Sequence, residues 1–230
     1  MITASPVASG DGCSSYWTDI DELVTRFQRG DGPAFERLVE RITPRISAYA
    51  SRFARDRDDH DDLVQETVLQ LYAALHSFRG DSAISTFIYA VMHRTCLSQA
   101  RKVRRYLARF SRFSDYEADS EWLPSAGSAD AVDAEDALFR RERGQLLDRY
   151  LRALPDDQRA AFVLAELHEL SYEQIAQVCG VPIGTVRSRI NRAKQKLQQQ
   201  IFNRPELFGR SGNEEGRGHN PGDAGRGASG

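Results

Sequence analysis

The stretch that indicates the fold class most clearly is residues 170–197, LSYEQIAQVCGVPIGTVRSRINRAKQKL. Ser171 is a good helix N-cap, because its hydroxyl can accept a hydrogen bond from a backbone N–H of the first turn. Gly180 can take the positive φ with which many helices end, and Pro182 suits the start of the next helix. The stretch therefore predicts a short helix over residues 172–179, a tight turn and a last helix that ends near residue 200, which together form a helix–turn–helix.

The predicted last helix has an apolar face and a basic face. Its apolar residues, which recur at helical spacing, are Val186, Ile190, Ala193 and Leu197. The other face is cationic, since residues 180–200 contain five Lys or Arg and no acid. A basic second helix fits the DNA major groove, whereas a charge run by itself would also suit a solvated surface. The candidate DNA contacts of this motif are Ser171, Tyr172, Thr185, Arg187, Ser188, Arg189, Arg192, Lys194 and Lys196, the last two toward phosphate.

Two further helices are predicted just upstream of this motif. The apolar positions of the first are Leu147, Tyr150, Leu151 and Leu154. Pro155 opens the second, and its apolar positions are Ala160, Val163, Leu164 and Leu167. These helices complete a small helical domain over residues 138–203.

A change of charge precedes this domain. Residues 82–114 contain seven Lys or Arg and no acid, whereas residues 115–136 contain eight acids and no Lys or Arg. The acidic stretch has little periodicity, so we interpret residues 113–137 as a flexible linker between two helical domains. A second interpretation is that its acids mimic phosphate and cover a basic surface.

Helical periodicity also runs through the first part of the chain. Apolar stripes with spacings of three and four residues recur from residue 18 to about residue 105. We expect breaks at residues 30–33, at Pro44, at the polar loop 55–62 (RDRDDHDD) and at residues 77–82. No strand-like alternation is present, so the fold class is all-α. Residues 1–17 and 204–230 are poor in apolar side chains and are expected to be disordered tails.

The composition excludes several classes of protein. The chain has 230 residues, with 31 Lys+Arg against 33 Asp+Glu, so only a local basic surface can argue for nucleic acid. No apolar run approaches the ~20 residues of a membrane span, and no signal peptide is visible, so we expect a cytoplasmic protein. The cysteines are Cys13, Cys96 and Cys179, whose scattered positions fit neither a disulfide framework nor a zinc site.

No catalytic pattern is found in the sequence. The histidines are scattered, and no Ser/His/Asp arrangement, HExxH motif or phosphate-binding loop is visible. We therefore expect no enzyme activity, no metal and no cofactor.

Two segments resemble a known family. Residues 58–105, which include DDLVQE and FRGDSAISTF, resemble region 2 of bacterial sigma factors, and residues 154–197 resemble region 4. The short two-domain layout is similar to that of the extracytoplasmic-function (ECF) group, with region 2 over residues 18–112. The resemblance implies an RNA polymerase specificity subunit that binds core polymerase and promoter DNA. In this family region 2 contacts the β′ clamp and the −10 element, and region 4 contacts the β flap and the −35 element.

Carried over by position, the family motifs assign roles to individual residues. The core-binding face is matched by Asp62, Leu63, Gln65 and Glu66. The −10 and melting positions, which would stack on flipped bases, bond them or hold phosphate, are Phe78, Arg79, Ser85, Thr86, Phe87, Tyr89, His93, Arg94, Arg101, Lys102, Arg104 and Arg105. Phe87 lies on the apolar stripe, so we expect Tyr89, which lies off it, to be the better DNA contact.

Alternative functions and further partners follow from the same features. A stand-alone helix–turn–helix regulator that binds operator DNA is the main alternative, and dependence on polymerase separates the two. The resemblance also implies that an anti-sigma factor is a possible partner.

Overall fold

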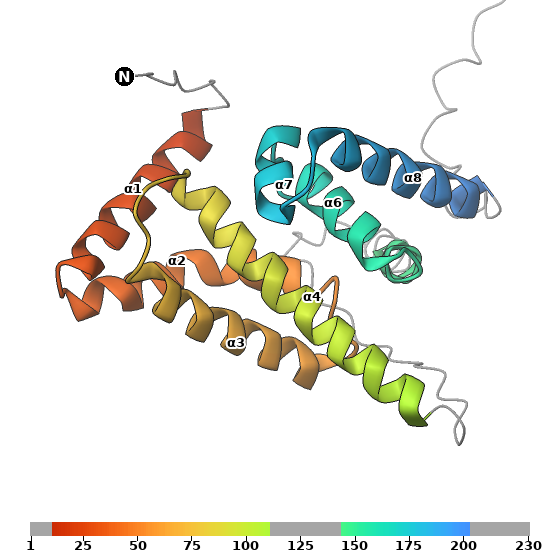
Figure 1. Ribbon diagram of the computed structural model, residues 1–230, viewed down its shortest axis with the longest axis horizontal. Coiled ribbons are helices and arrows are strands. Elements are labelled where there is room, and N and C mark those ends of the chain that lie inside the picture. The colour runs from red at the N-terminus through yellow and green to blue at the C-terminus, as the bar shows by residue number, and fades with distance from the viewer. Residues whose placement is uncertain (1–10, 111–143, 203–230) are drawn as a thin grey trace, which may run out of the picture.

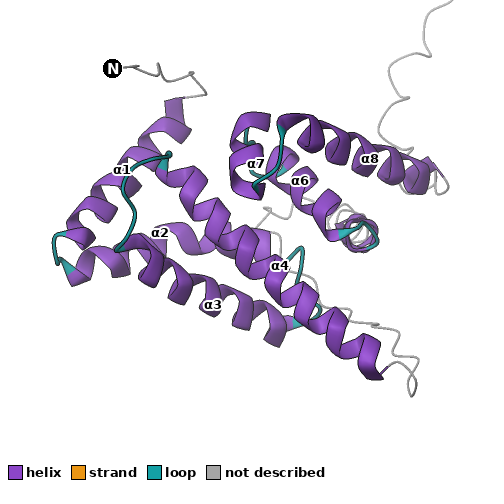
Figure 2. Cartoon of the chain, viewed as in Figure 1, coloured by secondary structure: helices purple, strands orange, loops and turns teal. Residues whose placement is uncertain are grey.

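The structure is a computed structural model that describes residues 11–110 and 144–202. These residues form helices joined by short loops and contain no strand, which confirms the all-α prediction (Figure 2). The helices are α1 (Asp11–Gln28), α2 (Gly32–Ala50), α3 (Arg57–Leu75), α4 (Ile84–Phe110), α6 (Asp156–Glu166), α7 (Tyr172–Cys179) and α8 (Ile183–Phe202). Residues 144–152 are also helical. The predicted linker, residues 113–137, and the predicted C-terminal tail, residues 204–230, lie outside the described residues.

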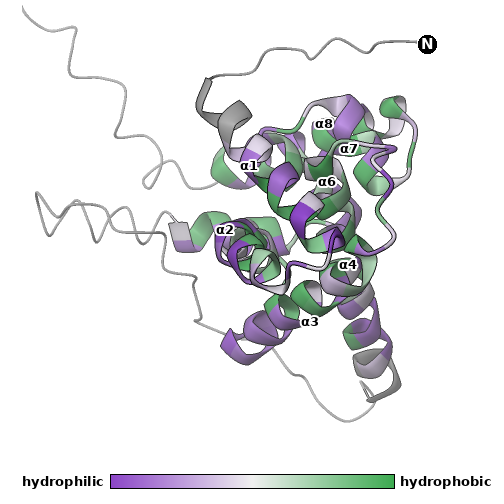
Figure 3. Cartoon of the chain, turned by 90° about the vertical axis from the view of Figure 1, so that its left-hand side faces the viewer, coloured by the Kyte–Doolittle hydropathy of each residue, from purple (hydrophilic) through white to green (hydrophobic). Residues whose placement is uncertain are grey.

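Helices α1–α4 form the first helical unit (Figure 1). Each helix contributes one apolar stripe to the core, as its three-to-four spacing predicts. Fully buried members include Ile20 of α1, Leu38 of α2, Leu71 of α3 and Met92 of α4. In Figure 3 the hydrophilic positions lie mainly on the outer sides of these helices.

The first helix starts earlier than expected. It begins at Asp11, so residues 11–17 are helical and the prediction of a disordered tail over residues 1–17 is wrong for them. The physical reason is that two aromatic residues of this segment, Tyr16 and Trp17, pack on α2. The low overall apolar content of residues 1–17 did not indicate this contact. The guanidinium of Arg45 lies 4.7 Å from the ring centroid of Tyr16 and 5.3 Å from that of Trp17. The hydroxyl of Tyr16 also donates to the backbone carbonyl of Arg41 at 2.8 Å.

Two predicted breaks are absent. Pro44 lies inside α2 rather than at the start of a new helix. A proline removes one helical hydrogen bond, but the residues on either side, Ile42 and Ile46, are both buried on one stripe that holds the helix together. The expected loop at 55–62 is mostly the first turns of α3, because Asp56 accepts a hydrogen bond from the backbone N–H of Asp59 at 2.8 Å and so caps the helix.

The helix–turn–helix forms as predicted. Ser171 accepts from the backbone N–H of Gln174 at 3.2 Å, and the side chain of Gln174 accepts from the N–H of Ser171 at 2.9 Å, which is a complete capping box. Gly180 ends α7 with φ 64°. The four predicted core positions of α8 are all buried.

The apolar face upstream of the motif differs from the prediction in two positions. Leu147 and Leu167 are 36% and 47% exposed, whereas Leu146 is buried with Leu151 and Leu154. Leu167 follows the last residue of α6, so the helical spacing no longer directs it to the core.

The two helical units pack against each other. Helix α4 contacts both α6 and α7 (Figure 1), and one apolar cluster runs from the first unit into Val163 and Ile175 of the second. Cys96 of α4 is buried, and Cys179 at the end of α7 packs against the same cluster. Burial raises the pKa of these thiols to about 12 and about 11. Burial also raises the pKa of Tyr49, and the thiols of Cys96 and Cys179 add to that rise.

Candidate nucleic-acid and partner interface

All four residues predicted to bind core polymerase line one groove between α3 and α4. Its volume is about 510 Å³. The groove is lined by Asp62, Leu63, Gln65, Glu66, Leu69, Gln70, Arg94, Thr95, Ser98, Gln99 and Lys102. The structure therefore brings the predicted residues together, with the correction that Leu63 is 3% exposed and belongs to the core below the groove rather than to its surface.

Leu69 is an apolar groove residue that the sequence patterns did not single out. Its side chain is 62% exposed, although it stands on a helix whose other leucines are buried. The residues around it are polar, and Glu66 accepts a hydrogen bond from Gln70 at 2.8 Å one turn away. An exposed apolar side chain with a polar rim is typical of a protein-binding surface. The signal in the sequence was a leucine off the apolar stripe of α3.

Two residues predicted to contact DNA lie in this same groove. Arg94 and Lys102 stand on α4 and line the groove opposite Asp62 and Glu66. Both side chains are exposed. They can serve either a partner protein in the groove or DNA along α4.

The loop between α3 and α4 presents part of the predicted −10 surface. Arg79 is exposed, and Phe78, Ser85 and Phe87 are half-buried. The rings of Phe78 and Phe87 pack 4.7 Å apart, centroid to centroid. These two rings support each other.

Three other residues predicted to contact DNA are buried. Thr86, Tyr89 and His93 are 4%, 2% and 8% exposed. The expectation that Tyr89 is the better contact than Phe87 is therefore wrong for this arrangement. The reason is that the second helical unit packs on α4. The spacing of apolar residues within one helix cannot predict such a contact with another unit.

Tyr89 and His93 belong to a buried polar network. The hydroxyl of Tyr89 accepts from a guanidinium N–H of Arg45 at 3.2 Å and lies 3.0 Å from Nδ1 of His168. Nδ1 of His93 lies 3.0 Å from the hydroxyl of Tyr49. Burial lowers the pKa of His93 to about 4 and that of His168 to about 4. Both imidazoles are therefore neutral in this arrangement near pH 7.

The C-terminal half of α4 carries an exposed basic row. Arg101, Lys102, Arg104 and Arg105 all have exposed side chains. Arg101 and Arg104 face acids of α6, described below, and Arg105 donates to the carbonyl of Arg101 at 3.3 Å. Such a row suits the phosphates of a nucleic acid.

The cations of the recognition helix α8 differ in whether they form ion pairs. Arg189 is paired with Asp157 at 2.9 Å and Lys194 with Glu166 at 2.8 Å. Arg187 and Arg192 are exposed and make no ion pair within the described part of the chain. The remaining predicted positions of the motif are tied to local structure: the hydroxyl of Ser171 caps α7, Ser188 donates to the carbonyl of Thr185 at 3.0 Å, and Tyr172 packs on the core.

The structure contains a Ser/His/Asp arrangement that the sequence analysis did not expect. Oγ of Ser47 lies 3.0 Å from Nε2 of His60, and Nδ1 of His60 lies 2.9 Å from a carboxylate oxygen of Asp61. Ser47 stands inside α2, where the backbone N–H groups are already bonded along the helix, so they cannot form an oxyanion hole. The arrangement instead ties the start of α3 to α2.

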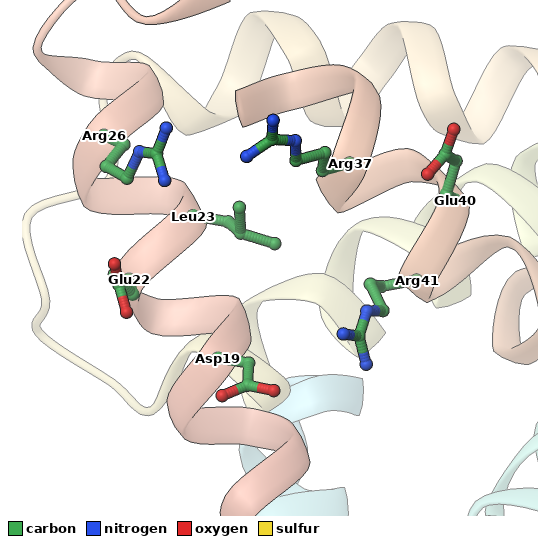
Figure 4. Close-up of a pocket in the computed structure, with 7 residues that line it drawn as sticks. All are labelled: Asp19, Glu22, Leu23, Arg26, Arg37, Glu40 and Arg41. Atoms are coloured by element: carbon green, nitrogen blue, oxygen red, sulfur yellow. The ribbon is translucent and has the colours of Figure 1, made fainter. Parts of the chain in front are cut away.

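A further hollow lies between α1 and α2 and holds none of the predicted site residues. Its volume is about 440 Å³, and it is lined by Asp19, Glu22, Leu23, Arg26, Arg37, Glu40 and Arg41 (Figure 4). Leu23 forms an apolar patch among charges of both signs. Over the described ranges, no group of three His, Cys, Asp or Glu is arranged to hold a metal ion. Likewise, no helix in those ranges has the length and apolarity to cross a membrane.

Comparisons with known proteins agree with this geometry. The chain matches the family described as Sigma-70 region 2 over residues 38–106 and Sigma-70, region 4 over residues 144–197. It is 37% identical over 184 residues to the ECF RNA polymerase sigma-E factor of Escherichia coli K12, covering 78% of this chain and 92% of that relative. It is 35% identical, with the same coverage, to the RNA polymerase sigma-H factor of Pseudomonas aeruginosa.

Solved structures show the same likeness. The sigma factor RpoE of Bartonella quintana, solved in complex with the anti-sigma factor NepR, superposes with a TM-score of 0.58 at 28% identity, over 73% of this chain and 96% of that one. CnrH, solved in complex with the cytosolic domain of CnrY, has a TM-score of 0.58 at 21% identity over 81% of this chain and 99% of that one, a likeness of fold.

Proposed function

Because this chain belongs to the ECF group of the sigma-70 family and is an RNA polymerase sigma factor, we propose that three of its surfaces divide the work of initiation. The groove between α3 and α4 binds core polymerase. The α3–α4 loop and the basic row of α4 bind the −10 element and help to melt it. The outer face of α8 binds the −35 element.

The groove between α3 and α4 suits a helical partner such as the β′ clamp. Asp62, Gln65 and Glu66 offer acceptors along one rim, and Arg94 and Lys102 offer donors along the other. Leu69 stands between them as an exposed apolar anchor. This arrangement provides both the apolar centre and the polar rim of a stable interface. It is the observation that carries the proposal, because a stand-alone DNA-binding regulator has no need of such a groove.

The −10 surface combines donors with aromatic support. Arg79 and Ser85 supply hydrogen-bonding groups beside the Phe78–Phe87 pair, while Arg101 and Arg105 hold the backbone phosphates. Binding of unstacked bases to such groups offsets the free-energy cost of melting, because stacking of a base on an aromatic ring contributes about 1–3 kcal/mol.

The −35 surface centres on Arg187 and Arg192. Their exposed guanidinium groups stand on the face of α8 opposite its buried stripe, where a second helix of this motif meets base edges. Lys194 and Lys196 lie further along α8 and meet phosphate.

Two further assignments complete the proposal. The chain performs no catalysis itself, because the polymerising chemistry belongs to the core enzyme. An anti-sigma factor is a candidate partner, since a relative of 28% identity was solved with one.

Transcription with purified components tests the proposal. Core polymerase is assayed on fragmented genomic DNA from the host with and without this chain, and the start sites are mapped. We expect defined start sites only when both are present. Tight, sequence-specific binding of the chain alone to one operator, with no effect on core polymerase, would favour the regulator instead.

A further inference from the structure

Two neighbouring acids at the start of α6 lie between the arginines of both helical units. Asp156 pairs with Arg104 of α4, and Asp157 lies 4.0 Å from Arg101 of the same helix. Asp157 also pairs with Arg189 of the recognition helix at 2.9 Å. All three arginines belong to the surfaces proposed to bind DNA.

A buried arginine fixes these acids at the boundary. Arg159 is 8% exposed and bonds Asp156 one turn away. Its guanidinium also donates to the backbone carbonyl of Arg52 at 2.9 Å and lies 5.0 Å from the ring centroid of Phe53. Arg52 itself pairs with Asp148 of the second unit. These contacts hold the second unit against the residues that directly follow α2.

The same contact buries part of the proposed −10 helix. His168, in the loop after α6, bonds Tyr89 and packs its ring 5.1 Å from that of Tyr89 and 5.7 Å from that of Tyr49. Thr86 and His93 are also buried in this arrangement. In this arrangement the two units cannot span separate promoter elements, because α4 and α7 touch directly.

We propose that Asp156 and Asp157 act as an intramolecular latch that holds the two DNA-binding units together and occupies arginines that promoter phosphates would otherwise bind. The inference rests on the proposed DNA-binding roles of Arg101, Arg104 and Arg189. It adds a regulated step: the free protein is closed, and DNA and the latch compete for the same guanidinium groups.

The physical basis is that carboxylate and phosphate are interchangeable partners of arginine. The side chains of Arg101 and Arg104 remain 65% and 62% exposed, so a phosphate can approach them while the latch is closed. Exposed ion pairs are weak and screened by salt, which makes these contacts easy to exchange. Acids that merely stabilised the start of α6 through its dipole would have no need to reach α4.

The test uses the full chain and the double variant D156N/D157N. Its matched control is E36Q/E40Q, which removes two exposed carboxylates of α2 that form no ion pair with the arginines of the latch or of α8. Small-angle X-ray scattering measures the radius of gyration, and fluorescence anisotropy measures binding of a nonspecific 20-base-pair duplex. We expect a larger radius of gyration and at least fivefold tighter DNA binding for D156N/D157N, and less than twofold change with an unchanged radius for the control.

A second variant opens the latch from the other side. R101Q/R104Q leaves α6 intact, so it also serves if D156N/D157N fails to fold, and we expect it to raise the radius of gyration. An unchanged radius in a folded R101Q/R104Q variant overturns the latch, as does a control that tightens DNA binding as much as D156N/D157N. Failure of the proposed function gives a different result, since the radius still changes but neither the wild-type chain nor D156N/D157N gives defined start sites with core polymerase.

Discussion

The hydroxyl of Tyr89 and Nδ1 of His168 lie 3.0 Å apart, although 79 residues separate them in the sequence. The pair joins the helix proposed to bind the −10 element to the loop between α6 and α7. Nε2 of His168 is buried without a hydrogen-bond partner in the described part of the chain, so the imidazole has no counter-charge that would favour its protonation.

This burial predicts that the closed arrangement weakens in acid. His93 and His168 have pKa values of about 4 here against 6.5 when exposed, mainly because burial disfavours the charged form. As pH falls through 6.5 the open form takes up protons that the closed form refuses, so closure loses stability down to about pH 4, on the order of 1–3 kcal/mol per histidine. Scattering at pH 7.5, 6.5 and 5.5 should show a rising radius of gyration. The H93Q/H168Q variant should show a radius that no longer depends on pH in this window, and an equally strong pH response in it would assign the effect to other groups.

Leu69 should anchor core polymerase. Truncating an exposed apolar anchor in a polar rim removes about 1–2 kcal/mol of binding, or roughly tenfold in affinity. We expect L69A to bind core polymerase more weakly by this amount in a competition assay, with unchanged thermal stability. The matched control is L147A, because Leu147 is also an exposed leucine but lies outside the groove. Equal affinities of L69A and the wild type would remove Leu69 from the interface.

The exposed arginines of α8 should determine promoter choice. R187A and R192A are each expected to cost about 1–3 kcal/mol in initiation from a promoter with its −35 element, if the lost contact is to a base. Core affinity should stay the same. R37A, which removes an exposed arginine of α2, is the control and should initiate as the wild type does. A loss of core affinity that matches the loss of initiation would mean that the domain has unfolded.

Two glycines allow a clean test of backbone strain in the helix–turn–helix. A Cβ atom added at either Gly180 or Gly184 would have no neighbouring atom within 4 Å, so substitution by alanine creates no clash at either position. Gly180 has φ +64°, whereas Gly184 lies in the first turn of α8. We expect G180A to destabilise the protein by about 1 kcal/mol and G184A to stabilise it by up to about 1 kcal/mol. Thermal denaturation measures both, and equal shifts would show that φ at residue 180 is not the constraint.

Much of the fold follows from local patterns in the sequence. The cap at Ser171, the turn at Gly180 and the buried stripe of α8 each depend on residues within one or two helical turns, and the structure confirms them. The missed features depend on contacts between distant segments. Residues 11–17 are helical because Tyr16 and Trp17 pack around Arg45, about 30 positions away, and α2 continues through Pro44 because its stripe is held by other helices.

The candidate site was predictable to different degrees. The grouping of Asp62, Gln65 and Glu66 on one groove follows from their helical spacing. The burial of Tyr89 does not, because it depends on how two helical units meet. The roles of the individual residues depend on partners, which the sequence does not contain, and they stay predictions.

The two thiols at the boundary, Cys96 and Cys179, allow opening of the two units to be measured by chemical labelling. With pKa values near 12 and 11 they are almost wholly protonated at neutral pH and react slowly with alkylating reagents while the units stay packed. Separation of the units would expose them and speed their alkylation. Peptide mapping after a brief iodoacetamide pulse would then record, without any attached label, how often the native protein opens in solution or on polymerase.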